Sequence, residues 1–283
     1  MNDILCKLIN DLDLEHTEKK GSRGEHIVLT YLYNEEWLIK LILQWYASNS
    51  RELDERITKK ITQSEKWFSE ARIGSFFNDR HTHADGIIGD FSFDADYVSK
   101  VTIDINFKSV TILEAKLGSS FSANTTNSYD FDQITRYIGN IAYMLYERNI
   151  DSLDNKTINL TIMIPKELPK IKGESIYKYL YIDPNDWACD PKFKFKLEQF
   201  YGIKENSDPL SNSYSKIKKR LKESVDLNDL TKRNQIDKYT EYVERLESSN
   251  CFTVSYIYYE DVIGFMGNNY EHYYEKCKKY NGL

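Results

Sequence analysis

Two spacings of hydrophobic residues divide the chain into expected helices and strands. Apolar residues recur every three or four positions along 23–47 (RGEHIVLTYLYNEEWLIKLILQWYA), which predicts a long helix with one buried face. The more polar stretch 52–69 predicts a second helix. Further helices are expected at 131–148, 226–247 and 269–280.

Short runs of β-branched and aromatic residues, separated by Asn, Asp, Gly and Ser, predict strands. The expected strands are 71–77, 84–91, 101–107, 110–117, 157–164 and 252–259. Because helices precede, interrupt and follow these strands, the pattern predicts an α/β fold in which helices flank a central mixed sheet. A length of 283 residues suits one large domain, 1–283, with a Lys-rich, mostly helical insertion at 165–250 before the last strand.

One expected strand, VTILEAKL at 110–117, carries two charges in an otherwise apolar run. Alternate side chains of a strand share a face, so Glu114 and Lys116 point to the same side. Burying both charges is costly unless they are paired or hold an ion. An ordinary salt bridge on an edge strand would also explain them.

A further carboxylate, Asp85, opens the expected strand ADGIIGDF. If the two strands pair, Asp85 and Glu114 converge on one divalent cation. Mg²⁺ prefers oxygen ligands, so two carboxylates and the Ala115 carbonyl would suit it. Lys116 would then hold a water beside the metal or stabilise developing negative charge. A turn-forming Asp-Gly pair is the alternative for Asp85. The rival ligands are Asp90 and Asp104.

Four segments, taken in chain order, resemble the motifs of a known family. Asp85 followed by Glu114-Ala115-Lys116 is similar to the D…(D/E)-x-K core of the PD-(D/E)xK nuclease superfamily. GSRGE at 21–25 fits a G-x-x-x-E pattern, and QITRY at 133–137 fits a Q-x-x-x-Y pattern. Together they resemble the RecB-like branch over roughly residues 21–164. No Pro precedes Asp85, which departs from the family pattern and leaves the choice among the candidate aspartates open.

The resemblance implies a restriction-endonuclease-like sheet and a Mg²⁺-dependent phosphodiesterase site, in which Mn²⁺ can substitute. It implies a nucleic-acid substrate, which we expect to be DNA rather than RNA. Lys116 would be the catalytic lysine, while Gln133 and Tyr137 would lie beside the substrate. The residues that it assigns to the metal or its waters are Asp85, Glu114, Ala115 and Glu25. Gln133 also fits a helix capping box beginning at Asp130.

Charge is distributed unevenly along the chain. The net charge is −6, yet residues 155–222 hold 14 Lys/Arg and 8 Asp/Glu, a net of +6 that leaves −12 on the remainder. A local basic stretch can bind phosphates, although a solvated lysine-rich helix gives the same pattern. The candidate nucleic-acid contacts are Lys192, Lys194, Lys216, Lys218, Lys219 and Arg220.

The histidines, the cysteines and the lengths of the apolar runs argue against several classes of site and protein. His81 and His83 form an H-x-H pair, but a zinc site would need a third ligand. The four cysteines lack a C-x-x-C pair, which favours reduced thiols over disulfides. No apolar run is long enough to cross a membrane, and the first residues lack the features of a secretory signal. We therefore expect a cytoplasmic protein without membrane association.

These patterns favour a nuclease in restriction, phage defence or repair, because no G-x-x-x-x-G-K-[ST] helicase motif is present. Its expected protein partners are a second copy of the same chain, in a homo-oligomer, or another subunit of a defence complex. The alternative is a non-catalytic module that uses the same fold to bind nucleic acid or protein.

Overall fold

The computed structural model describes residues 33–49, 53–77, 82–97, 99–117, 131, 133–166, 209–224 and 229–280. Its helices are α3 (Glu35–Asn49), α4 (Glu55–Thr58), α5 (Gln133–Glu147), α7 (Pro209–Glu223), α8 (Leu230–Ser248), α9 (Tyr259–Met266) and α10 (Asn268–Tyr280). Its strands are β1 (Trp67–Ile73), β2 (Thr82–Gly89), β3 (Phe91–Phe93), β4 (Lys100–Ile103), β5 (Ser109–Ala115), β6 (Thr157–Ile164) and β7 (Phe252–Tyr258).

The strands form one mixed sheet in the order β3-β4-β1-β2-β5-β6-β7. β2 pairs antiparallel with β1 and β5, whereas β5, β6 and β7 run parallel. The side chains of β6 are buried over almost its whole length, as expected for a central parallel strand covered on both faces. The predicted α/β class, a mixed sheet flanked by helices, is confirmed.

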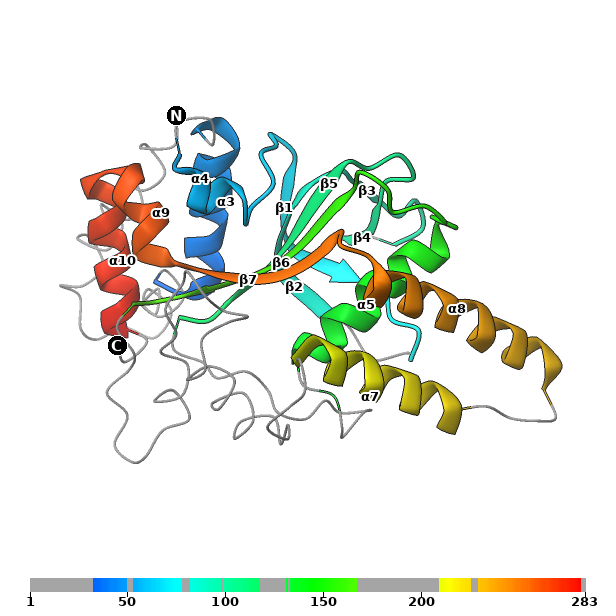
Figure 1. Ribbon diagram of the computed structural model, residues 1–283. Helices are drawn as coiled ribbons and strands as arrows, with labels where there is room; N and C mark the ends of the chain where they lie inside the picture. Colours follow the sequence, from blue (N-terminus) through cyan, green and yellow to red (C-terminus); the bar gives the residue numbers. More distant parts are fainter. Residues whose placement is uncertain are drawn as a thin grey trace, which may run out of the picture.

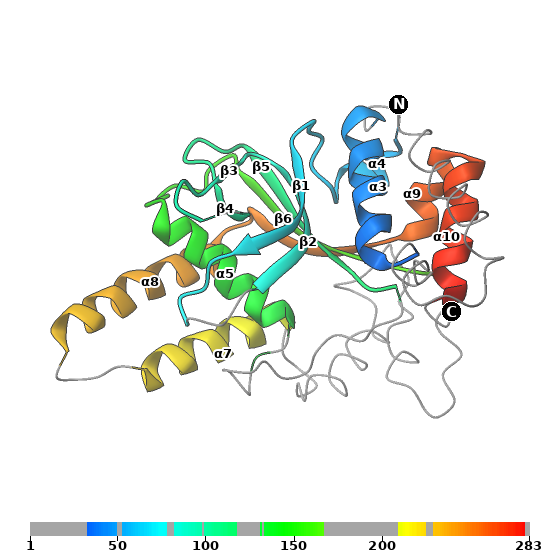
Figure 2. The same ribbon diagram turned by 180° about the vertical axis from the view of Figure 1, so that it is seen from behind.

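Helices cover both faces of this sheet (Figures 1 and 2). One hydrophobic cluster joins the sheet to α5, α7 and α8, with Tyr137, Ile217 and Tyr239 among its buried members. A second cluster joins the other face to α3, α9 and α10, with Leu41 and Tyr273 buried within it. The described part of the insertion is helical and shares a core with the sheet. None of the described helices is long and apolar enough to cross a membrane.

The second expected helix, 52–69, is wrong. Only the four residues of α4 are helical, and β1 already begins at Trp67. Tertiary hydrogen bonds hold the intervening segment: the Tyr46 hydroxyl donates to the Ile61 carbonyl at 2.6 Å, and the Thr62 N–H donates to Thr111 Oγ1 at 2.8 Å. These partners lie far away in sequence, so helical spacing could not reveal them.

The end of β5 lies at the centre of the sheet rather than at its edge, which overturns the edge-strand alternative for Glu114 and Lys116. β2 and β6 pair with β5 on its two sides, with Gly86 opposite Leu113 and Ala115 opposite Met163. Glu114 is only 2% exposed. A carboxylate in this position needs partners, because an unpaired buried charge is strongly unfavourable.

Candidate active site at the carboxyl end of β5

Three side chains surround the buried Glu114 carboxylate. Lys116 Nζ, Gln133 Nε2 and the Tyr137 hydroxyl all donate hydrogen bonds to it. The Tyr137 oxygen also lies 3.1 Å from the His83 carbonyl oxygen. Gln133 and Tyr137 are four residues apart on α5, so they reach Glu114 from the same helical face. The motif residues of β5 and α5 therefore form one hydrogen-bonded group.

Asp85 joins this group from the neighbouring strand β2. Its Oδ2 accepts a hydrogen bond of 2.6 Å from the Ala115 backbone N–H, which places the carboxylate beside Glu114. Burial, reinforced by the negative charge of Glu114, raises the pKa of Asp85 from 3.8 to about 8. The structure thus brings together Asp85, Glu114 and Lys116, as expected if the two strands pair. Asp85 and Gly86 lie within β2 rather than in a turn before it, so the turn-forming alternative for Asp85 is wrong.

The rival aspartates serve the fold instead. Asp90 Oδ2 accepts hydrogen bonds from the Lys108 and Ser109 N–H groups, at 2.7 and 3.2 Å, and so fixes the turn before β5. Asp104 accepts a hydrogen bond from Ser92 and lies 3.7 Å from Lys66 Nζ. Neither carboxylate has a described contact with the Glu114 group.

A residue that the sequence analysis missed, Glu35, approaches from the opposite face of the sheet. It lies in the first turn of α3, and its carboxylate accepts a hydrogen bond from the Leu117 N–H. Burial raises the pKa of Glu35, and the charge of Glu114 raises it further. The sequence predicted one helix over 23–47 with Glu35 in its interior, whereas residues 33–34 are not helical and α3 begins at Glu35; the spacing therefore did not single out this acid. Glu25, which the G-x-x-x-E pattern favoured, lies outside the described residues.

Glu70 adds another acid at the border of the site. It occupies a left-handed backbone conformation (φ 53°) within β1, where the register passes from the Ser69–Gly86 pair to the Ala71–Ala84 pair. Its carboxylate lies 4.0 Å from His83 Nδ1. Burial raises its pKa, with further contributions from nearby acids that include Glu114. Non-glycine residues in this conformation are strained, and such strain is concentrated at functional sites.

The group contains more acid than base. Burial alone would lower the pKa of Lys116, but Glu114, Glu35 and Asp85 together raise it above its usual value, so the amine is protonated. One ammonium therefore faces several carboxylates in a partly desolvated place. Asp85 Oδ1 has no described hydrogen-bond partner and is suited to a cation. Among the described residues, however, no three acidic, His or Cys side chains are arranged around one point as metal ligands.

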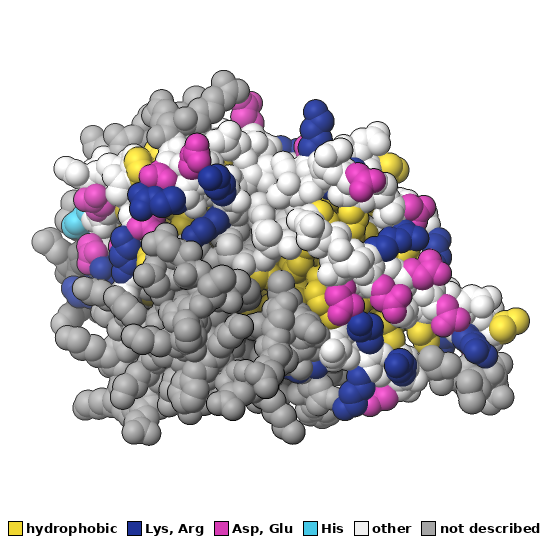
Figure 3. Space-filling model, in the orientation of Figure 1, with side chains coloured by type: hydrophobic (Ala, Val, Ile, Leu, Met, Phe, Trp, Pro, Cys, Tyr) yellow, Lys and Arg dark blue, Asp and Glu magenta, His cyan; other side chains and the backbone are white. Residues whose placement is uncertain are grey.

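Other predicted residues fall elsewhere. Lys216, Lys218, Lys219 and Arg220 lie on α7, where Ile217 and Leu221 are buried. Lys218 pairs with Glu247 at 2.7 Å and Lys219 with Glu223 at 3.8 Å, so part of this charge is internally balanced. Basic side chains gather over α7, interspersed with acidic ones (Figure 3). The predicted contacts and ligands outside the described residues are Lys192, Lys194 and His81.

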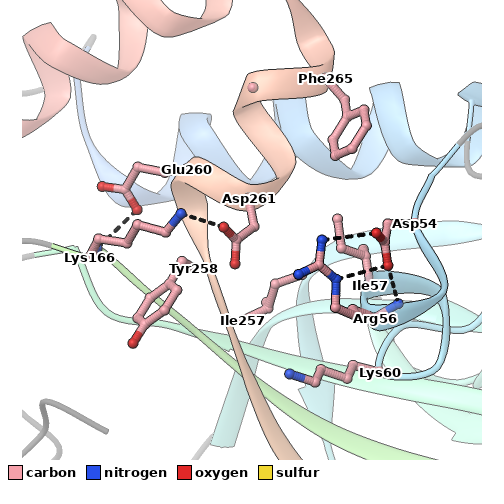
Figure 4. A pocket seen from close by; sticks show the side chains of 11 residues that line it. Asp54, Arg56, Ile57, Lys60, Lys166, Ile257, Tyr258, Glu260, Asp261 and Phe265 are labelled. Carbon is pink, nitrogen blue, oxygen red and sulfur yellow. Dashed lines mark hydrogen bonds and ion pairs between the residues drawn. The ribbon is translucent and has the colours of Figure 1, made fainter. Parts of the chain in front are cut away.

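A separate hollow of about 420 Å³ lies at the start of α9 (Figure 4). Four of its charged side chains are paired with one another: Lys166 with Asp261 at 2.6 Å, and Arg56 with Asp54 at 2.9 Å. None of the carboxylates around Glu114 lines it. The internally paired charges make this hollow a poorer candidate for catalysis than the acidic group at the end of β5.

No family model matches the chain, and comparisons with curated proteins and with solved structures also found no match. The resemblance to the RecB-like nucleases therefore rests on the motif residues and their arrangement.

Proposed function

We propose that the protein is a Mg²⁺-dependent nuclease that hydrolyses phosphodiester bonds of nucleic acid, DNA in preference to RNA. The observation that carries the proposal is the placement of Asp85 beside Glu114, with Lys116 paired to Glu114, at the carboxyl end of β5. This is the geometry that the D…(D/E)-x-K resemblance requires.

The donor set suits a hard divalent cation. Asp85 and Glu114 offer carboxylate oxygens; Ala115, whose carbonyl is a further candidate ligand, follows Glu114 in the chain and donates its N–H to Asp85. Burial and the charge of Glu114 keep Asp85 protonated up to its raised pKa of about 8, and a cation between the two groups would favour the ionised carboxylate. A bound Mg²⁺ would stabilise charge on the phosphate and lower the pKa of a coordinated water, while Mn²⁺ would substitute for it.

The side chains around these carboxylates have separate tasks. Lys116 supplies a positive charge next to Glu114, where it can stabilise the developing charge of the transition state. Gln133 and Tyr137 hold the Glu114 carboxylate in one orientation. The first turns of α3 and α5 each send a side chain, Glu35 and Gln133, to the end of β5, and helix N-termini favour anionic groups such as phosphate.

The second candidate is a non-catalytic module with the same fold. Three donors already satisfy Glu114, which leaves a carboxylate only about one further acceptor position. A structural polar cluster would have this property. The net charge of −6 also favours a protein partner over nucleic acid.

One cleavage experiment separates the two candidates. Supercoiled plasmid and a labelled single strand are incubated with the protein in Mg²⁺, in Mn²⁺ and in EDTA. We expect cleavage only with a divalent cation, and none for Lys116→Ala. The matched control is Lys166→Ala, which removes a lysine beyond the end of the neighbouring strand β6 and should cleave normally. Metal-independent cleavage, or equal activity of both variants, would contradict the proposal.

A further inference from the structure

A second hollow, of about 580 Å³, lies where α5 meets the α7–α8 pair. Four aromatic side chains line it, together with polar side chains from α7, α8 and the segment after β1. These aromatic residues are Phe76, Phe77, Tyr143 and Tyr146. The volume falls in the range typical of small-ligand sites, and aromatic walls with a polar rim suit a flat, polar-edged ligand.

Packing behind the hollow holds the rings in place. Phe76 stacks on the buried Tyr239 with centroids 4.2 Å apart and planes at 6°. Tyr143 and Tyr146 lie nearly parallel, 5.9 Å apart at 26°. The side chains of Phe76, Tyr143 and Tyr146 are only half-buried, so part of each of these rings remains accessible. Such a platform is rigid before any ligand arrives, which reduces the entropy lost on binding.

The rim of the hollow is basic where it faces α7 and α8. Arg220 and Lys232 line it, and Arg220 belongs to the row of cations along α7. Among the described residues of the lining, the acid is Asp229, which caps α8 by accepting a hydrogen bond of 2.9 Å from the Lys232 N–H. A cationic rim around aromatic faces matches a nucleotide, whose phosphate is anionic and whose base stacks.

The hollow lies along α5 from the acidic group. α5 begins at Gln133, which donates to Glu114, and Tyr143 follows ten residues later, about 15 Å along the helix. α7 lies beside α5 and also leads toward the hollow. Near its start, Ser213 Oγ accepts a hydrogen bond of 2.9 Å from Thr135 Oγ1, and farther along, Arg220 lines the hollow. At about 3.4 Å per nucleotide in a helical strand, the separation spans about four or five nucleotides.

We infer that the hollow holds an unpaired base of the substrate strand, about four or five nucleotides from the bond at the acidic group, while the cations of α7 contact the intervening phosphates. The substrate class is therefore nucleic acid with a single-stranded segment. This inference rests on the proposed function.

The test measures binding of a fluorescein-labelled duplex with a single-stranded tail, by anisotropy, in Ca²⁺ to prevent cleavage. Abasic sites are placed one at a time along the tail. Stacking of one base on aromatic side chains contributes about 5- to 150-fold in affinity. We expect a loss of this size at one or two adjacent tail positions for the wild type.

Variants then locate the effect. Tyr143→Leu should bind the intact tail as weakly as the wild type binds the abasic one, and should no longer respond to the abasic site. Tyr97→Leu removes an exposed ring outside the hollow and should behave like the wild type. Lys232→Ala, at an exposed position, should weaken tail binding more than Arg233→Ala, its neighbour outside the hollow.

Each other outcome has a definite meaning. If no abasic position matters, or if Tyr97→Leu loses the response as fully as Tyr143→Leu, the inference is overturned while cleavage by the wild type still supports the proposed function. If Lys232→Ala and Arg233→Ala bind the tail equally weakly, the two cations act only as diffuse positive charge, and the assignment of the base to this hollow fails. A wild type that neither binds nor cleaves nucleic acid overturns both proposals.

Discussion

Replacing Asp85 with Asn should stabilise the metal-free protein. In the folded chain, burial and the Glu114 charge raise the pKa of Asp85 from 3.8 to about 8. Asparagine has nearly the same shape, carries no charge, and can still accept the hydrogen bond from the Ala115 N–H. The substitution therefore removes the cost of burying a carboxylate beside another one.

The size of the effect follows from linkage. An unfolded Asp85 loses its proton near pH 3.8, whereas the folded one keeps it until about pH 8. Between these values the unfolded state binds fewer protons, so each unit of rising pH lowers the free energy of unfolding by about 1.4 kcal/mol. At pH 7 the accumulated cost is about 4 kcal/mol, and at pH 4 it is less than about 1 kcal/mol.

The assay is urea unfolding in EDTA from pH 4 to pH 8, followed by circular dichroism. We expect Asp85→Asn to exceed the wild type by about 2–4 kcal/mol at pH 7, with the difference shrinking toward pH 4. The control, Asp90→Asn, should gain nothing, because that carboxylate accepts two backbone hydrogen bonds. Mg²⁺ should stabilise the wild type but not Asp85→Asn. A variant no more stable than the wild type at pH 7, or a difference that grows toward acid, would refute this reasoning.

Three further variants test the site and the fold. Lys116→Ala should abolish cleavage, measured as kcat. Its Tm should fall only slightly, because Gln133 and Tyr137 still donate hydrogen bonds to Glu114; a destabilised variant with residual activity would contradict a catalytic role. Tyr137→Phe should lower the free energy of unfolding by about 1–3 kcal/mol in the same urea assay, since Glu114 loses a buried donor. Glu35→Gln should reduce cleavage at low Mg²⁺ more than at high Mg²⁺; an equal loss at both would indicate a purely structural contact.

Much of the fold was predictable because its signals are local. The span of β6, Thr157–Ile164, follows directly from a run of β-branched and apolar residues interrupted only by Asn159, and the 131–148 helix agrees with α5 to within two residues at either end. The shared face of Glu114 and Lys116 was also foreseeable from two-residue alternation. The sequence placed Asp85 at the start of a strand, whereas it lies within β2, and only the pairing of β2 with β5 brings it beside Glu114.

Only the tertiary structure decided the rest. Segment 52–69 does not form the predicted long helix, because residues distant in sequence, Tyr46 and Thr111, form hydrogen bonds with its backbone. Glu35 enters the site because the first turns of α3 and α5, which pack on opposite faces of the sheet, each send a side chain to the end of β5. Periodicity identifies which face of an element is apolar, and therefore the sequence determined the layers. Which polar side chains share one desolvated point depends on how those layers are placed against each other, and local patterns carry no information about that placement.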